Sequence, residues 1–373
     1  MRAALVLVIL TCASGALHGA EPADRIFFNA RFYTVEPTRP TAGAVAVKDG
    51  RFVYVGDASG ARDWAGPHTQ RVDLGGAMAM PGLVDAHVHA QRAGVKTLFE
   101  CNFPFSATPE QIAERVRTCV AENPDALWVR GGQWDSGFFE RYDIPSPRAF
   151  LDAISGDKAV LLNDDSYHNG WANSRALALA GITADTPDPA DDTIVRDPET
   201  GEPNGLLLEG AEQAMYEQLP SWSAAQQRAG AREAMRIANR LGFTGFKEAA
   251  ATEAEIAAFH ALDSEDAMTA HVATALRTPG GDAAATFDYA WIDRVLEQYS
   301  GRRLHTGFVK IFMDGVPTPA RTAAMLDPYL PDAEGRRSRG MLHLPESRLS
   351  REMIELDRRG YTVKIHTAGD RAV

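Results

Sequence analysis

The stretch AMPGLVDAHVHA, residues 79–90, decides how the rest of the chain is interpreted. Pro81 and Gly82 interrupt the preceding segment, and the apolar strand that follows ends in His87 and His89. Alternate residues of a strand share a face, so the two imidazoles are expected to point the same way. Two imidazoles at the end of a strand can chelate one divalent ion. A His-x-His pair by itself is often structural, but this position at the end of an apolar strand favours a metal site.

The residues before this strand have the composition of a small β unit. Strand-like segments occupy residues 26–28, 31–35, 44–47 and 52–55. Residues 48–51 join the last two segments as a hairpin turn, in which Gly50 takes the positive φ angle that such turns need. Few helix signals occur here, so a domain made of strands is expected before Met80.

Four more buried-type strands follow much later in the chain. With 83–89 as the first strand, they span 243–250, 268–276, 308–313 and 362–366. Helical patterns separate them, for example from the predicted N-cap Ser223 to Leu241 and over 292–299. This alternation predicts an α/β fold with a parallel sheet, in which the carboxyl ends of the strands form the mouth of a barrel. The residues from about 90 to 240 are then an insertion after the first strand.

Length and composition limit the possible classes of protein. The chain has 373 residues, too many for one ordinary core, so two domains or one large barrel are expected. Its hydrophobic content of 45% and charged content of 24% are those of a folded globular protein and argue against disorder. Its net charge of -12, without a Lys/Arg cluster, argues against a nucleic-acid partner, because phosphate binding needs a basic surface.

Residues 1–20 have the pattern of a cleaved secretory signal peptide. A basic start is followed by the apolar run 3–10 and then by small residues, and the run is too short for a stable membrane anchor. A periplasmic or secreted protein is therefore expected, with a buried N-terminal strand as the alternative. A lipoprotein cleavage site at Cys12 is disfavoured by Thr11 before it. No later stretch is long and apolar enough for a membrane span.

Removal of the signal peptide would leave two cysteines, Cys101 and Cys119. They could pair in an oxidising compartment, but the sequence does not show whether their side chains meet. We interpret them as two free or loosely coupled thiols. Neither lies in a Cys-x-x-Cys motif, so a redox role is not expected.

Residues 79–90 resemble the signature of the amidohydrolase superfamily. Further stretches are similar, in order, to its third family, which contains N-substituted formamide deformylase-like enzymes: GGQWD (131–135), HNGWANSRALALAGI (168–182), TPDPADDTIVRDPETGEPNGLLLEGA (186–211), LGFTGFKEA (241–249), VKIFMDGVPTPARTAAM (309–325) and VKIHTAGDRAV (363–373). The resemblance runs from about Arg25 to the last residue. It implies a partial (β/α)₈ barrel of the TIM type over 81–373, limited to strands one to five. It also implies the N-terminal part of a β-sandwich domain over 21–80.

The resemblance also implies a metal site. The family's His-x-His pair corresponds to His87 and His89, and the histidine expected on strand five corresponds to His366. Lys310 lies on strand four, where many members carry a lysine that becomes carboxylated and bridges two metal ions. The expected cofactor is a divalent metal, with two zinc ions as the favoured form. The alternatives are an ordinary lysine and an ordinary histidine at the ends of strands.

Three residues are candidates for substrate contact: Trp134, His168 and Asp314. Trp134 and His168 lie in the insertion, and His168 follows the apolar segment 159–162 and a polar loop. A helix-capping or packing role is the alternative for this group. Asp314 follows strand four, where it is expected to hydrogen-bond either a ligand or a loop.

Two functional residues of the family have no counterpart in this sequence. The family carries a histidine on strand six and an aspartate on strand eight, and the aspartate takes the proton from the attacking water. The chain ends at Val373 after strand five, so no catalytic residue is assigned in it, and five parallel strands cannot close a barrel. We expect a fragment of a longer gene product that is inactive by itself, with a short degenerate protein as the alternative.

The expected function is hydrolysis of a non-peptide carbon–nitrogen bond, as in an amide, formamide or cyclic amide, by metal-activated water. The expected partner is a small-molecule substrate, and its identity and the oligomeric state are left open. An ester or lactone hydrolase would use the same site. A catalytically inactive secreted binding or regulatory protein is the alternative from another class.

Overall fold

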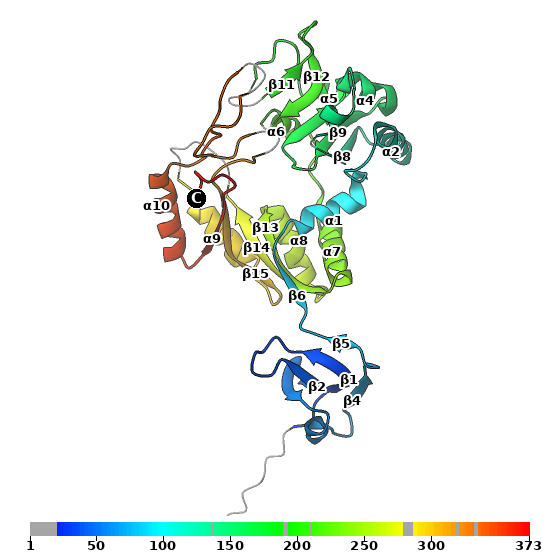
Figure 1. Ribbon diagram of the computed structural model, residues 1–373, viewed down its shortest axis with the longest axis vertical. Helices are drawn as coiled ribbons and strands as arrows, with labels where there is room; N and C mark the ends of the chain where they lie inside the picture. The colour runs from blue at the N-terminus through cyan, green and yellow to red at the C-terminus, as the bar shows by residue number, and fades with distance from the viewer. Residues whose placement is uncertain are drawn as a thin grey trace, which may run out of the picture. The chain divides into compact units, whose positions relative to one another are not determined.

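The computed structural model describes residues 21–373, except for 136, 189–192, 209, 279–285, 318–320 and 332–334. The predicted signal peptide therefore lies outside the described residues. The chain divides into two compact units, the first ending at Gly82 and the second running from Leu83 to Val373 (Figure 1). Within the described residues, no helix has the length and apolar character needed to cross a membrane.

The first unit is built on one five-stranded sheet. Its elements are β1 (Arg25–Tyr33), β2 (Thr41–Lys48), β3 (Arg51–Gly56), the short 3-10 helix η1 (Gly60–Trp64), β4 (Gln70–Asp73) and β5 (Met78–Ala79). The strand order is β3-β2-β1-β4, with β5 paired to β1. The predicted hairpin joins β2 to β3, and Asp49 and Gly50 in its turn both have positive φ angles. The β-sandwich to which this sheet was assigned stays a prediction.

Five parallel strands form the main sheet of the second unit. They are β6 (Leu83–Val88), β13 (Phe243–Ala251), β14 (His271–Arg277), β15 (Leu304–Phe312) and β16 (Thr362–His366). Their order is β16-β15-β14-β13-β6, so each predicted strand lies beside its neighbour in the chain. β15 begins earlier than predicted, because Leu304 and His305 already pair with β14 although the continuous apolar run begins only at Phe308.

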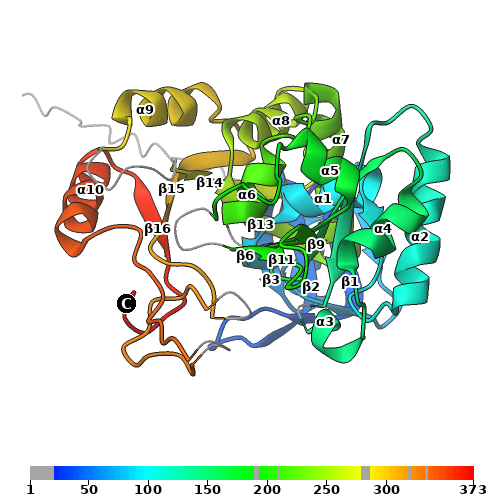
Figure 2. The same cartoon turned by 90° about the horizontal axis from the view of Figure 1, so that it is seen from above.

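Helices cover the outer face of this sheet (Figures 1 and 2). They are α7 (Ala224–Arg240), α8 (Glu253–Ser264), α9 (Tyr289–Gln298) and α10 (Glu346–Arg358). α7 begins where predicted, since the Ser223 hydroxyl accepts from the backbone N–H of Gln226 in a capping box. Buried apolar residues such as Phe246, Phe259 and Val309 fill the space between sheet and helices. This layer fixes the strands whose ends carry the predicted site.

The main sheet curls into a half-barrel. Lys364 on β16, at one edge of the sheet, donates from Nζ to the carbonyl oxygen of Ala86 on β6, at the other edge, over 2.9 Å. Three strands separate these two edges in the sheet order, so one side chain can join them only if the sheet curves strongly. The inner face is therefore concave, and residues from opposite edges lie close to one another.

A second sheet forms the insertion between β6 and β13. Its order is β11-β12-β10-β9-β8-β7, from β7 (Cys101–Asn102), β8 (Trp128–Trp134), β9 (Ala159–Asp164), β10 (Asn169–Ala172), β11 (Thr193–Arg196) and β12 (Pro203–Leu208). Its helices are α2 (Pro109–Glu122), α3 (Phe138–Arg141), α4 (Pro147–Ser155), α5 (Ser174–Leu179) and α6 (Gly210–Tyr216). The apolar segment 159–162 lies in β9.

Helix α1 (Ala90–Phe99) connects the half-barrel to this insertion. It packs closely against α7, because a Cβ atom on Gly94 would lie 2.0 Å from the carbonyl oxygen of Gly230. Both positions thus need glycine for the helices to approach. The predicted insertion of about 90–240 therefore includes two helices, α1 and α7, that pack on each other outside its sheet.

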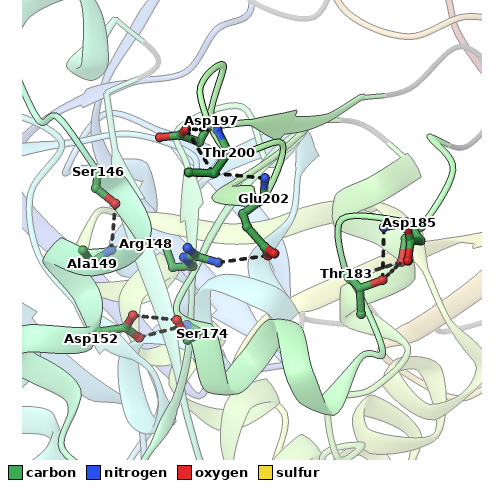
Figure 3. A network of polar contacts seen from close by, with 11 residues as sticks. Ser146, Arg148, Ala149, Asp152, Ser174, Thr183, Asp185, Asp197, Thr200 and Glu202 are labelled. Atoms are coloured by element: carbon green, nitrogen blue, oxygen red, sulfur yellow. Dashed lines mark hydrogen bonds and ion pairs between the residues drawn. The ribbon is translucent and has the colours of Figure 1, made fainter.

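Polar contacts tie the helices of the insertion to its loops (Figure 3). On α4, Arg148 lies 3.8 Å from the carboxylate of Glu202, and Asp152 accepts bonds from both the backbone N–H and the hydroxyl of Ser174. Asp197 stabilises the turn before β12 by accepting from the backbone N–H and hydroxyl of Thr200. These contacts hold α4, α5 and the turn before β12 together.

A disulfide bond joins Cys101 in β7 to Cys119 in α2, with Cα atoms 5.8 Å apart. Our interpretation of these residues as free or loosely coupled thiols is therefore wrong. Ile112, Val116 and Cys119 share the buried face of α2, and packing of this face brings Cys119 against Cys101. The packing of the helix against the strand decides this pairing. The spacing of two cysteines in a sequence does not show whether their side chains meet.

Replacing both cysteines, as Cys101→Ser with Cys119→Ser, should lower the free energy of unfolding of the insertion by about 3 kcal/mol, because the disulfide closes a loop with a separation of 18 residues. Urea unfolding followed by the fluorescence of the buried Trp134 and Trp171 measures the loss. A Cys12→Ser background restricts a thiol titration of denatured, unreduced protein to these two cysteines. Two free thiols in that titration would contradict the disulfide.

Candidate metal centre

His87 and His89 lie next to each other where the first strand of the half-barrel ends. β6 ends at Val88, and His89 is the N-cap residue of α1. The two ring centroids are 5.7 Å apart and the ring planes are nearly perpendicular, at 86°. Partial burial, followed by the charges of Lys364 and Lys310, lowers the pKa of His87. A lower pKa favours the neutral imidazole, which is the form that binds metal ions.

A buried carboxylate contacts the second histidine of this pair. Glu248, near the end of β13, is 2% exposed, and its Oε1 lies 3.4 Å from Nδ1 of His89. Its Oε2 accepts from the backbone N–H of Gln91 at the start of α1 over 2.8 Å. A carboxylate on one ring nitrogen fixes the tautomer and leaves the other nitrogen, Nε2, as a metal ligand. Glu248 thus gives His89 the environment that is typical of metal-binding histidines.

Lys310 lies on β15 with its side chain buried at 2% exposure. Burial, with a smaller contribution from the charge of Lys364, lowers the pKa of Lys310 to about 8. Its Nζ lies 4.8 Å from the ring centre of Phe312. A lysine with this pKa is partly neutral near pH 8, and only the neutral amine can react with carbon dioxide to form a carbamate.

Two other lysines lie on strands of the half-barrel. Lys364 on β16 pairs in register with Lys310 and reaches the carbonyl oxygen of Ala86, as described above. Lys247 on β13 places its Nζ 3.6 Å from the ring centre of Phe308. Burial lowers the pKa of both Lys247 and Lys364. The concave face thus removes water from the ammonium groups of these lysines, and this loss of hydration lowers their pKa values.

His366 is the last residue of β16 and lies beside Asp314. Nε2 of His366 is 2.9 Å from the carbonyl oxygen of Gly315 and 3.6 Å from Oδ1 of Asp314. The contact with a carbonyl requires a hydrogen on Nε2, which leaves Nδ1 as the nitrogen with a free lone pair. His366 therefore keeps one nitrogen for a ligand.

Asp314 joins the loops that follow β15 and β16. Its buried carboxylate accepts hydrogen bonds from the backbone N–H groups of Ala324, Ala368 and Gly369, over 3.0, 2.9 and 2.7 Å. These bonds correspond to the loop-bonding alternative for Asp314. A contact with substrate stays a prediction.

Trp134 and His168 lie in different surroundings within the insertion. The ring of Trp134 is 4% exposed and packs 5.2 Å from Phe139 and 6.5 Å from Trp171, between centroids. These contacts correspond to the packing alternative. His168 follows Tyr167 in the turn between β9 and β10, where its backbone N–H donates to the Asp164 carboxylate over 3.2 Å. Substrate contact by Trp134 or His168 stays a prediction.

The structure places His87 on β6, His89 directly after it, Lys310 on β15 and His366 on β16, and it brings the first two into contact. His87 and His89 form the contacting pair, and Lys310 and His366 lie on neighbouring strands. Among the residues that the structure describes, no group of three His, Cys, Asp or Glu side chains is close enough to hold a metal ion. The histidine pair offers two nitrogen donors of the kind that divalent ions take, and the Glu248 carboxylate contacts one of these rings.

Sequence reasoning missed Glu248 and Lys364, although both carry a readable pattern. Glu248 interrupts an apolar strand near its carboxyl end, in the stretch LGFTGFKEA, which is the position expected for functional residues of a barrel. Lys364 precedes His366 by two positions on one strand and therefore shares its face. The same arguments that selected His87 and His366 would have selected these two residues.

Comparisons with known proteins agree with this geometry. The model of a family described as "Amidohydrolase family" matches residues 70–373. N-substituted formamide deformylase of Arthrobacter pascens is 30% identical over 80% of this chain, and exoenzymes regulatory protein AepA of Pectobacterium carotovorum subsp. carotovorum is 27% identical over 94%. The chain spans 56% of the length of the first relative and 75% of the second. An uncharacterized metal-dependent hydrolase from Pyrococcus horikoshii OT3 has a similar fold, with a TM-score of 0.69, 22% identity and coverage of 93% of this chain and 66% of its own.

Glu248→Gln should weaken binding of a divalent metal, with zinc as the probe, by about tenfold or more, because the amide holds the His89 tautomer less firmly than the carboxylate does. Competition with a chromophoric chelator measures the dissociation constant without any catalytic assay. Glu255→Gln is the matched control, because Glu255 is a neighbouring carboxylate whose capping contact with Thr252 a glutamine can also make. Equal zinc affinity of Glu248→Gln and the wild type would show that the carboxylate does not orient a ligand.

Proposed function

Because this chain belongs to the amidohydrolase family, we propose that it carries part of a metal-dependent site that hydrolyses a non-peptide carbon–nitrogen bond. The observation that carries the proposal is the contact between the buried Glu248 carboxylate and Nδ1 of His89, beside His87. Similarity to a protein named N-substituted formamide deformylase supports formamides as the substrate class, with other amides and cyclic amides as relatives of that bond.

The residues of the chain have distinct roles in this proposal. His87 and His89 bind metal through neutral imidazoles, and Glu248 keeps Nε2 of His89 available. The neutral amine of Lys310 would form a nitrogen–carbon bond to carbon dioxide and release a proton to water, and the two oxygens of this carbamate would then be available to divalent ions, which we propose are two zinc ions. His366 supplies a further nitrogen from β16. When bound, the metal polarises the substrate carbonyl and lowers the pKa of a coordinated water.

The lowered pKa of Lys310 supports the carbamate in this proposal. Removing the proton from an ordinary lysine is unfavourable near neutral pH, whereas burial has already lowered the pKa of this amine to about 8. The carbamate carries a negative charge, which Lys364 on the adjacent strand can compensate. In this proposal, burial favours the neutral amine of Lys310 before the reaction, and the charge of Lys364 favours the anionic carbamate after it.

A second candidate function is binding or regulation without catalysis. The relative named exoenzymes regulatory protein favours it, since that name describes regulation and not hydrolysis. Hydrolysis of esters or lactones is a further alternative, because the same site would polarise either carbonyl. A panel of a formamide, an ester and a lactone, assayed with and without zinc, separates the three functions.

Lys310→Ala should remove at least one of about two bound divalent ions and nearly all formamide hydrolysis, because the bridging carbamate is lost. Elemental analysis and formate release measure the two effects in the purified full-length protein. Lys247→Ala, which replaces another lysine with a lowered pKa, is the control and should keep its metal. Full metal content and full rate in Lys310→Ala would exclude the bridging role, and a wild type without bound transition metal would exclude the site.

We also propose that residues 1–20 direct the chain to the periplasm or out of the cell. The Cys101–Cys119 disulfide supports this location, because such bonds persist in oxidising compartments. The mature chain should then begin between Leu17 and Glu21. N-terminal sequencing of protein recovered from its native host checks the start, and a cytosolic chain that begins at Met1 would refute export.

A further inference from the structure

Helix α1 presents two cations on the side that faces away from α7. Gly94 and Val95 contact α7, whereas Arg92 and Lys96 lie one turn apart on the side toward the insertion. Nζ of Lys96 donates to the hydroxyl of Tyr167 over 2.8 Å and to Oε1 of Gln133 on β8 over 3.2 Å. The guanidinium carbon of Arg92 lies 3.8 Å from the ring centre of Tyr167. We call Arg92, Lys96 and Tyr167 the α1 cluster.

Two locally unfavourable features meet in the α1 cluster. Arg92 occupies the N3 position of α1, whose first turn contains no acidic residue, and a cation there opposes the helix dipole. Tyr167 has a φ angle of 58°, a left-handed conformation that is strained for an aromatic residue. Its turn is held by Asp164, whose carboxylate accepts from the backbone N–H groups of His168 and Asn169. Strain of this kind is concentrated at functional sites.

The charges of Arg92 and Lys96 have no carboxylate in direct contact. Within the described part of the chain, Arg92 makes no ion pair or hydrogen bond, and the two acceptors of Lys96 are uncharged. The carboxyl group nearest in sequence is that of Glu100, which is half-buried; burial raises its pKa, and the charges of Lys96 and Arg92 act on that pKa in the opposite direction. The ring of Tyr167 lies against the guanidinium, which leaves the N–H groups at the edge of that plane available to a ligand.

The α1 cluster begins one helical turn from the histidine pair. His89 is the N-cap of α1 and Arg92 is at N3, three residues later in the first turn of the helix. Lys96 follows Arg92 by four residues on the same side. A ligand bound at His87 and His89 can therefore extend along α1 and place a second group on Arg92 and then Lys96.

We infer that Arg92 and Lys96, held by Tyr167, bind a carboxylate of the substrate while the scissile carbonyl lies at His87 and His89. This inference rests on the proposed function and narrows its substrate class to N-formyl or N-acyl amines that carry a carboxylate. A planar guanidinium matches the two oxygens of a carboxylate, and the ammonium supplies a second charge-assisted hydrogen bond. Arg92 and Lys96 are thus specificity residues, and they take no part in the bond cleavage.

A matched pair of compounds tests the inference. N-formylbenzylamine is neutral, and para-(formamidomethyl)benzoate is the same molecule with a carboxylate. Calorimetry on the zinc-loaded protein should show about tenfold or tighter binding of the benzoate, the range of charge-assisted hydrogen bonds. Arg92→Gln should reduce this preference, mainly through a higher KM for the benzoate with a smaller change in kcat. Arg92→Lys should keep most of it, and Arg117→Gln, an exposed arginine on α2, should leave it unchanged.

The outcomes separate the inference from the proposed function. Preferential binding of the benzoate that Arg92→Gln reduces, without hydrolysis of either compound, supports the carboxylate site and contradicts the formamide reaction. Hydrolysis of both compounds with equal KM supports the reaction and overturns the carboxylate site. Binding of neither compound, or a preference that survives in Arg92→Gln, also overturns it.

Discussion

Parallel pairing of β6, β13, β14, β15 and β16 is the constraint on which the candidate site depends. Parallel strands run in one direction, so their carboxyl ends meet at one edge of the sheet, and His87, Glu248 and His366 arrive there from three different strands. Curling then brings the two outer strands within reach of one side chain, as the bond from Lys364 to Ala86 shows. Without this curvature, residues of β6 and β16 would lie at opposite ends of a flat sheet.

The buried ionisable groups on this sheet are more consistent with a functional site than with a contribution to the stability of the fold. Lys310 and Glu248 are both 2% exposed, and each pays a desolvation cost that an apolar residue would avoid. Glu248 offsets this cost by accepting the N–H of Gln91 and contacting His89. The pKa of Lys310 is lowered, so its amine can lose the proton, and the neutral amine has a smaller desolvation cost than the ammonium. Both arrangements keep reactive forms of these groups close to the histidine pair.

The insertion contributes to the same region through helix α1. This helix starts at the histidine pair His87 and His89, packs on α7 through glycine, and presents Arg92 and Lys96 toward the insertion. In the insertion, Gln133 and Tyr167 accept hydrogen bonds from Lys96, and the ring of Tyr167 lies against Arg92. The strained turn at Tyr167 is held by Asp164. One helix therefore couples the half-barrel to the part of the chain that differs most from a plain barrel, and such additions commonly set substrate choice.

The sequence by itself determined the positions of the five strands and their parallel arrangement, the hairpin at Asp49–Gly50, the cap of α7 at Ser223 and the adjacent pair His87–His89. Each of these follows from short-range periodicity or turn chemistry, which a chain carries locally. Tertiary structure decided the Cys101–Cys119 bond, the contact of Glu248 with His89, the role of Asp314 as a tie between loops and the meeting of Arg92 with Tyr167. These contacts join residues from different elements, and they arise only when helices and strands pack, because local preference does not encode which surfaces meet.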